Sequence, residues 1–242
     1  MHVNCDIGER GADHPVDREL MNHIALANIA CGGHAGDRES VDAFLALARE
    51  KGIAVSAHLS YPDRENFGRT SMDISRKELL TSLDEQYKLM GAVEAVKFHG
   101  ALYNDCWVDG KLASDLADWL KAKGIQTIIT PDQSSLAVES AKRGITVMAE
   151  AFAERRYAYN PANQQLSLVS RKLDYASIHD LEEAVAHAQR IVEEGRVDGH
   201  IDDGKGHVEI RPLPLKADTI CIHSDSPISL ELAARLSASG DK

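Results

Sequence analysis

The sequence lacks any long apolar run, and no segment approaches the roughly 20 residues that a membrane-spanning helix needs. Its first residues, 1–6, show no basic stretch followed by an apolar core, so we expect no signal peptide. Cysteine is scarce: four residues are scattered without a C-x-x-C pair, which argues against a disulfide framework and favours a reducing compartment. These absences together predict a cytoplasmic protein.

Positive charge is also in deficit. The chain has 27 lysines and arginines against 38 aspartates and glutamates, a net charge of −11. This balance argues against nucleic acid or an anionic membrane surface as a partner. Neither a Gly-x-x-x-x-Gly-Lys-Ser/Thr loop nor a His-Glu-x-x-His motif is present, so a bound nucleotide or metal would need another arrangement of ligands.

The sequence does contain a repeated unit: a short apolar run, a polar turn and a helical pattern. In the clearest copy, residues 25–30 read as a buried strand, Asp37 takes the N-cap position, and residues 38–51 carry the apolar stripe of a helix. Seven such units predict an α/β fold with a mostly parallel, closed or nearly closed sheet of seven strands. We expect one domain over residues 1–242, with strands at 3–5, 25–30, 53–57, 93–98, 125–129, 145–149 and 219–222.

The repeat is interrupted twice. Residues 10–20 are polar and read as a loop, and residues 99–104 read as the turn after the fourth strand. Residues 151–215 break the rhythm, with a helix expected near 178–194 and small strands near 166–169 and 208–210. We expect this long segment to cover the pocket or to form a partner surface.

Polar groups follow almost every predicted strand. They are Asp6, His34, Asp37, His58, His99, Glu150, His223 and Asp225. Because the carboxyl ends of parallel barrel strands lie on one face, we expect these side chains to share an active site. Two chemistries fit. Asp6, His34 and His58 could bind a divalent metal; without metal, the same groups could act as acid and base while Lys97 and Arg69 hold an anionic substrate.

Six motifs in order resemble the LamB/YcsF family, and they span residue 3 to about residue 230. They are residues 4–9 (NCDIGE), 28–37 (NIACGGHAGD), 57–69 (AHLSYPDRENFGR), 96–104 (VKFHGALYN), 150–157 (EAFAERRY) and 222–225 (IHSD). The resemblance implies a seven-stranded βα barrel of the glycoside hydrolase/deacetylase type, in agreement with the seven units.

The resemblance also implies a function: opening of the lactam of 5-oxo-L-proline to L-glutamate, coupled to ATP hydrolysis, together with subunits B and C of a 5-oxoprolinase. Because an unstrained lactam is a poor electrophile, phosphorylation of its oxygen would help water to attack. Candidate catalytic residues are Asp6, His34, His58, His99 and Glu150. Candidate substrate-binding residues are Asp37, Asp63, Arg69, Lys97, Tyr103, Asn104, Arg155, Arg156, His223 and Asp225.

Two other functions stay open at this point. One is a metal-dependent, deacetylase-like amidohydrolase that uses no ATP, and the other is a non-catalytic subunit that binds a lactam. A homo-oligomer is compatible with the sequence in every case.

Overall fold

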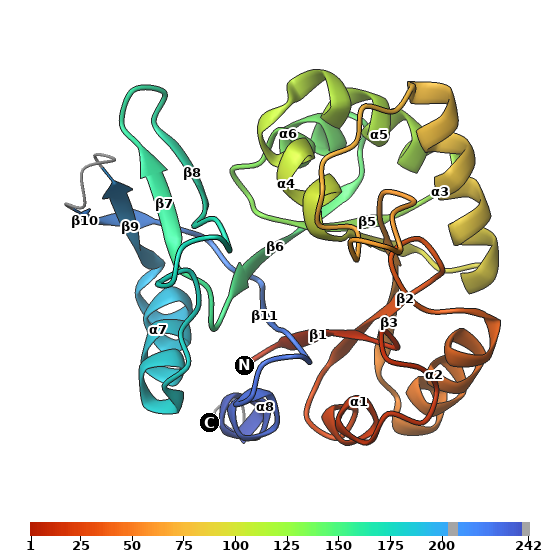
Figure 1. Cartoon of the computed structure of the whole chain (residues 1–242), viewed down its shortest axis with the longest axis horizontal. Coiled ribbons are helices and arrows are strands. Elements are labelled where there is room, and N and C mark those ends of the chain that lie inside the picture. Colours follow the sequence, from red (N-terminus) through yellow and green to blue (C-terminus); the bar gives the residue numbers. More distant parts are fainter. Residues whose placement is uncertain (203–207, 239–242) are drawn as a thin grey trace.

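Seven short parallel strands form a closed barrel at the centre of the molecule (Figure 1). The computed structural model describes residues 1–202 and 208–238. Around the barrel the strand order is β1-β11-β6-β5-β4-β3-β2. The strands are β1 Val3–Ile7, β2 Leu26–Ala30, β3 Ala54–Leu59, β4 Ala95–Phe98, β5 Thr127–Thr130, β6 Thr146–Phe152 and β11 Thr219–Ile222. The seven-stranded α/β barrel predicted from the sequence is confirmed.

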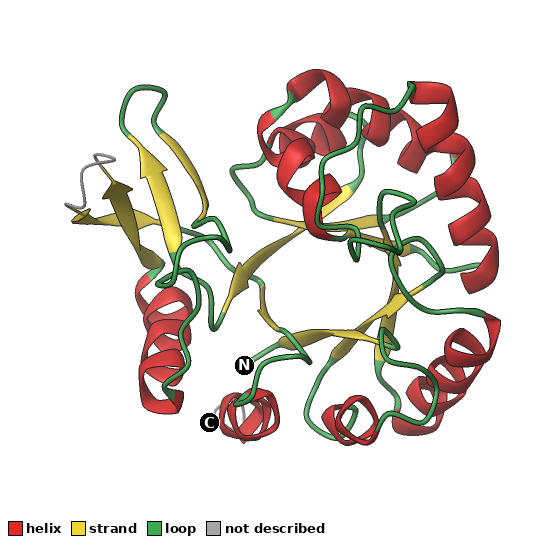
Figure 2. Cartoon of the chain, viewed as in Figure 1, coloured by secondary structure: helices red, strands yellow, loops and turns green. Residues whose placement is uncertain are grey.

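Helices cover the outside of this ring (Figure 2). They are α1 Pro15–Leu20, α2 Arg38–Lys51, α3 Arg76–Met90, α4 Gly100–Val108, α5 Gly110–Ala122, α6 Ser135–Lys142 and α8 Ser229–Ala238. Asp37 is the N-cap of α2, as predicted: its carboxylate accepts the Ser40 backbone N–H at 2.9 Å, and the Ser40 hydroxyl lies 2.9 Å from the Asp37 backbone nitrogen. This capping box orients α2 directly after the turn that carries His34.

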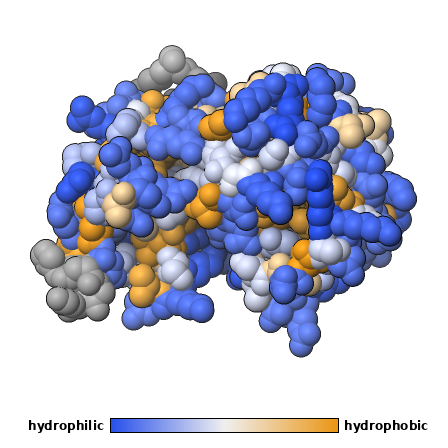
Figure 3. All heavy atoms as spheres, turned by 90° about the horizontal axis from the view of Figure 1, so that it is seen from above, coloured by the Kyte–Doolittle hydropathy of each residue, from blue (hydrophilic) through white to orange (hydrophobic). Residues whose placement is uncertain are grey.

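The strands are short and apolar because both of their faces are covered. Every residue of β1 and β2 is buried, and the core continues through the helix faces packed against the barrel. All four cysteines are free and buried within this core. In the part of the chain that the structure describes, no helix has the length and apolarity to cross a membrane. Hydrophilic residues cover most of the face seen in Figure 3, where apolar side chains form small separate areas.

A second, four-stranded sheet lies beside the barrel, between β6 and β11 in the chain (Figure 1). It contains β7 Tyr157–Asn160, β8 Gln165–Leu168, β9 Arg196–Asp202 and β10 Val208–Pro214 in the order β10-β9-β7-β8, with helix α7 Leu181–Glu194 between β8 and β9. The sequence predicts β8, α7 and part of β10, but not β7 or β9. Both missed strands mix polar, small and larger apolar or aromatic residues, so neither shows a clean apolar run.

Two helices replace predicted loops. The sequence predicts a loop at residues 10–20, where the structure has the six-residue α1, and a turn at 99–104, where α4 begins directly after His99. Helix α4 escapes prediction because five of its nine residues are buried and no polar face gives it a helical period. Its position has a functional consequence, since Tyr103 and Asn104 are thereby presented from a helix.

Helix α7 makes the stability of the protein depend on pH. His187 is 9% exposed and its Nε2 has no hydrogen-bond partner, and burial lowers the pKa of His187 to about 4, with Arg190 and Arg156 lowering it further. Because the pKa of the unfolded chain is higher, this group's contribution to stability is complete above about pH 6.5 and is lost as the pH falls towards 4.

We therefore expect acidification from pH 8 to pH 5 to cost the wild type about 2 kcal/mol more in free energy of unfolding than it costs His187→Leu. Urea denaturation of both proteins at the two pH values measures this difference. Equal losses in the two proteins would contradict it.

Candidate active site at the carboxyl end of the barrel

The carboxyl ends of β1, β3 and β4 bring charged and titratable side chains together. Asp6 lies opposite Asn28 in the β1–β2 register, and His58 lies opposite Lys97 in the β3–β4 register. His99 follows β4 and is the N-cap residue of α4. In a parallel barrel these ends lie on one face, so residues far apart in the sequence converge there.

Lys97 links two buried carboxylates. Its ammonium group, 2% exposed, lies 2.9 Å from Asp6 Oδ1 and 2.8 Å from Glu150 Oε1. Asn28 donates to Asp6 Oδ1 at 2.9 Å, and the Tyr103 hydroxyl donates to Glu150 Oε2 at 2.8 Å. Burial alone would lower the pKa of Lys97, but Asp6 and Glu150 outweigh it and hold that pKa well above its usual value. Lys97 is therefore a fixed positive charge.

The same electrostatics keep Asp6 ionised. Burial would raise the pKa of Asp6, but His58 and Lys97 outweigh it and hold that pKa well below its usual value. The second carboxylate oxygen, Oδ2, lies 3.2 Å from His58 Nε2. Asp6 is thus an anion that contacts an ammonium group on one side and an imidazole on the other.

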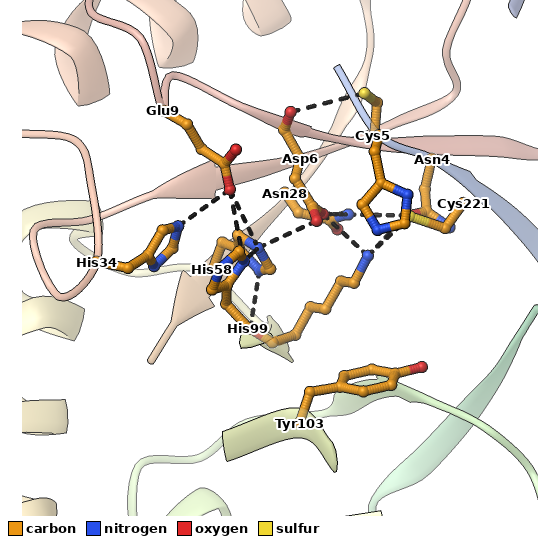
Figure 4. A network of polar contacts seen from close by, with 12 residues as sticks. Asn4, Cys5, Asp6, Glu9, Asn28, His34, His58, His99, Tyr103 and Cys221 are labelled. Atoms are coloured by element: carbon orange, nitrogen blue, oxygen red, sulfur yellow. Dashed lines mark hydrogen bonds and ion pairs between the residues drawn. The ribbon is translucent and has the colours of Figure 1, made fainter. Parts of the chain in front are cut away.

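Three imidazoles surround Glu9, which the predicted site residues do not include. Figure 4 shows Glu9 directed towards His34, His58 and His99. The rings of His34 and His99 are stacked at 3.7 Å between centroids, and His58 stands edge-on to both. Burial lowers the pKa of His34 and holds the pKa of His99 well below its usual value. These two rings are neutral at pH 7.

The loop between β3 and α3 closes over the imidazoles. Phe67 has φ +54°, the left-handed region that a bulky residue rarely adopts, and its carbonyl accepts from His99 Nε2 at 3.1 Å. Gly68 has φ +63°, and a Cβ placed there would lie 2.9 Å from the Cβ of His34. Only glycine lets this loop approach the rings so closely.

A cavity of about 390 Å³ opens above Asp6 and Lys97. This volume falls within the roughly 300–1,000 Å³ of typical small-molecule sites. Cationic groups line its wall, from the β3–α3 loop (Arg69), the segment after β6 (Arg155) and the segment after β8 (Arg171 and Lys172). Burial lowers the pKa of Arg155 to about 10, so this guanidinium is charged at neutral pH. A cationic wall in an acidic protein selects anionic ligands.

The structure brings most of the predicted site residues to this cavity or into contact with its lining. Those in the lining are Asp6, His58, Arg69, Lys97, His99, Tyr103, Asn104, Arg155 and His223; His34 stacks on His99, Glu150 pairs with Lys97, and Asp225 pairs with Arg69 at 3.0 Å.

Three predicted substrate-binding residues lie elsewhere. Asp37 caps α2, Asp63 accepts from the Asn66 backbone N–H in its own loop, and Arg156 pairs with Glu183 of α7. Their carboxylates and guanidinium have local partners, which is why a strand-end or motif position did not place them in the cavity.

The predicted metal triad of Asp6, His34 and His58 also needs correction. Asp6 Oδ1 is already bonded to Lys97 and Asn28, and the donor atoms that lie within 4.8 Å of one another belong instead to Glu9, His34, His58 and His99. The triad therefore does not form one ligand set.

The sequence reasoning missed several contributors. Glu9 had a usable signal, since it follows Asp6 by three residues at the same strand end. Asn28 lies inside a quoted motif, but its inward direction depends on the β1–β2 register. Arg171 and Lys172 lie in the irregular segment after β8, where no pattern in the sequence points to the cavity.

A closed barrel with an ammonium–carboxylate pair, clustered imidazoles and a cationic wall at its carboxyl end defines a βα-barrel protein built for acid–base chemistry on a small anionic molecule. The chain belongs to the LamB/YcsF family, whose sequence profile matches residues 1–241.

Named relatives span nearly the whole chain. A protein of Acinetobacter baumannii (strain AB307-0294), named as the A subunit of 5-oxoprolinase, is 35% identical over 247 residues, covering 98% of this chain and 92% of the relative. One of two or more A subunits so named in Agrobacterium fabrum (strain C58), the one numbered 1, is 37% identical over 253 residues, covering 98% and 94%. The crystal structure of a lactam utilization protein from Thermus thermophilus superposes with a TM-score of 0.79 at 30% identity, covering 99% of this chain and 96% of that one.

Proposed function

We propose that the chain is the A subunit of an ATP-dependent 5-oxoprolinase and that its cavity opens the lactam ring of 5-oxo-L-proline, or of a close analogue, to L-glutamate. One observation carries the proposal: the Lys97–Asp6 pair, 2.9 Å apart, lines a cavity whose wall is cationic. The names of the relatives support the choice of substrate.

The cationic wall suits the substrate's carboxylate. Arg155 donates to the backbone carbonyls of Val169 and Ala176, at 2.7 and 3.3 Å, so these contacts leave its charge without a carboxylate to neutralise it. Arg69 shares its charge with Asp225. Arg171 completes this wall. Guanidinium groups bind a carboxylate or phosphate through paired N–H donors, which orients the ring above Asp6 and Lys97.

Ring opening then uses the groups at the cavity floor. A water molecule held beside His58 transfers a proton to Asp6 as its oxygen attacks the lactam carbonyl carbon. Negative charge develops on the carbonyl oxygen, where Lys97 stabilises it. The carbon–nitrogen bond breaks and the proton passes from Asp6 to the ring nitrogen, which yields the amino acid and leaves Asp6 ionised again.

ATP and the partner subunits belong to the same proposal. Transfer of the γ-phosphoryl group of ATP to the lactam oxygen would form an oxygen–phosphorus bond, release ADP and make the ring carbon easier to attack. We assign this coupling to the complex with subunits B and C. The proposed setting is the cytoplasm, where ATP and a reducing environment are both available.

The test is glutamate release from 5-oxoproline by the chain alone and with its B and C subunits, each with and without ATP. We expect release only in the complete, ATP-supplied mixture. Release without ATP would favour the deacetylase-like amidohydrolase, and lactam binding without turnover in the assembled complex would favour a non-catalytic role for this chain.

Arg171→Gln should weaken substrate binding. The change removes one positive charge from the cavity wall, so we expect KM for the lactam to rise about 10-fold, with kcat changed less than about 2-fold. Steady-state kinetics of the complex measure both constants.

Arg156→Gln is the matched control for this experiment. It removes the same charge from a guanidinium that pairs with Glu183 at 2.5 Å outside the cavity. KM should not change in this variant. An equal rise in both variants would indicate a general electrostatic effect in place of a binding contact.

A further inference from the structure

We infer that Glu9, His34, His58 and His99 form a binding site for a divalent transition-metal ion of the zinc type. The four donor atoms are Glu9 Oε1, His34 Nε2, His58 Nε2 and His99 Nδ1, and the measured separations are 3.1, 3.5 and 3.9 Å from Glu9 to the rings of His34, His99 and His58. His58 and His99 are 3.0 Å apart.

These separations match a tetrahedral site. Zinc binds imidazole nitrogen and carboxylate oxygen at about 2.0–2.2 Å, which places the ligand atoms of a tetrahedron roughly 3.3–3.5 Å apart. The four side chains are between 0% and 9% exposed, so the site is already formed and largely shielded from solvent. Three nitrogens and one oxygen are a set that zinc and its neighbours in the first transition row prefer.

The hydrogen bonds behind the rings aim their lone pairs at one point. His58 Nδ1 lies 3.3 Å from the carbonyl oxygen of Lys97, and His99 Nε2 lies 3.1 Å from that of Phe67. A carbonyl oxygen only accepts, so these nitrogens carry the protons, and His58 Nε2 and His99 Nδ1 face each other with lone pairs. Two lone pairs at 3.0 Å repel, and a shared cation removes that repulsion.

A second cluster, Asp6 with Cys221 and His223, does not qualify. The Lys97 ammonium group lies 2.9 Å from Asp6 Oδ1 and 3.1 Å from Cys221 Sγ, so it already supplies the positive charge there and would repel an ion. The two clusters thus predict opposite outcomes for one experiment.

The site opens onto the substrate cavity, because His58 and His99 also line that cavity. An ion held there would polarise a water molecule or a substrate carbonyl, while Asp6 remains the proton acceptor. Metal binding itself does not depend on which lactam is the substrate.

The test is calorimetric titration of the chelator-treated full chain with zinc chloride, together with the visible spectrum of the Co²⁺ form. We expect one ion per chain and the absorption of four-coordinate cobalt. Glu9→Gln should weaken zinc binding at least about 100-fold, and His223→Gln should leave it unchanged.

A thermal melt of each metal-free variant shows whether it folds, and His34→Gln replaces Glu9→Gln if the latter does not. No saturable zinc or cobalt binding, or equal binding by wild type and Glu9→Gln, would overturn the inference. Loss of binding in His223→Gln alone would also overturn it, because the ion would then occupy the other cluster. None of these readouts requires lactam turnover, so failure of the proposed function would not affect them.

Discussion

Lys97→Met is expected to lower the free energy of unfolding by about 3–5 kcal/mol and to abolish lactam opening. Methionine fills much of the volume of lysine but leaves Asp6 and Glu150 as two buried carboxylates without their cation. Uncompensated buried charge is among the costliest changes a core can suffer. Guanidinium-chloride denaturation gives the stability, and glutamate release by the assembled complex gives the activity.

Two further variants make this prediction specific. Lys97→Met combined with Glu150→Gln removes one of the orphaned charges, so part of the stability should return while activity stays absent. Lys123→Met removes a lysine that pairs with Asp84 at 2.7 Å where both side chains are about one-third exposed, and such pairs contribute about 0–1 kcal/mol. A Lys97→Met protein as stable as wild type would disprove the buried-pair interpretation.

Asp6→Asn should reduce kcat of the complex about 10³-fold while leaving the fold intact. Asparagine has nearly the same shape, and its side-chain oxygen can still accept from Lys97 and Asn28. The variant loses the ionised oxygen that faces His58 and accepts the proton of water. KM should change only a few-fold, because the cationic wall that binds the carboxylate is untouched. Steady-state kinetics and a thermal melt separate these effects.

Asp225→Asn is the corresponding control. Asp225 also follows a barrel strand, but its carboxylate is half exposed and pairs with Arg69 at the rim. We expect kcat to fall less than about 5-fold in this variant, since no proton transfer is assigned to it. If Asp6→Asn kept more than about a tenth of wild-type kcat, Asp6 would not be the proton acceptor.

The barrel could be predicted from the sequence because its pattern is local. Each unit announces itself through a short apolar run and an amphipathic helix, as at β2 and α2, where Asp37 also marks the helix start. The second sheet gave a weaker signal, since β9 alternates charged residues with valine, glycine and isoleucine. Its strands pair because the chain folds back on itself, and such non-local pairing leaves little trace in sequence periodicity.

The site was predictable where chemistry coincides with strand ends, and less so where partners decide. Asp6, His58 and His99 follow from position alone. That Asp6 bonds Lys97 and not a metal depends on which face Lys97 presents inside the barrel. Asp63 and Arg156 belong to the same motifs as true cavity residues, yet local hydrogen bonds direct them away. Register and local competition for partners are tertiary properties.

The pairing of β1 with β11 has a consequence for synthesis of the protein. Val3 lies opposite Ile220, and Cys5 lies opposite Ile222, so the first strand made is completed by the last. At about 5–20 residues per second, a ribosome needs roughly 10–45 s to reach β11 after β1 has left the active centre. During that time β1, which carries Asp6, has one unpaired edge, and the Cys221 contact of Lys97 does not yet exist. Only a chain translated through its final barrel strand can close the ring, so a prematurely terminated chain has an open edge and an incomplete pocket.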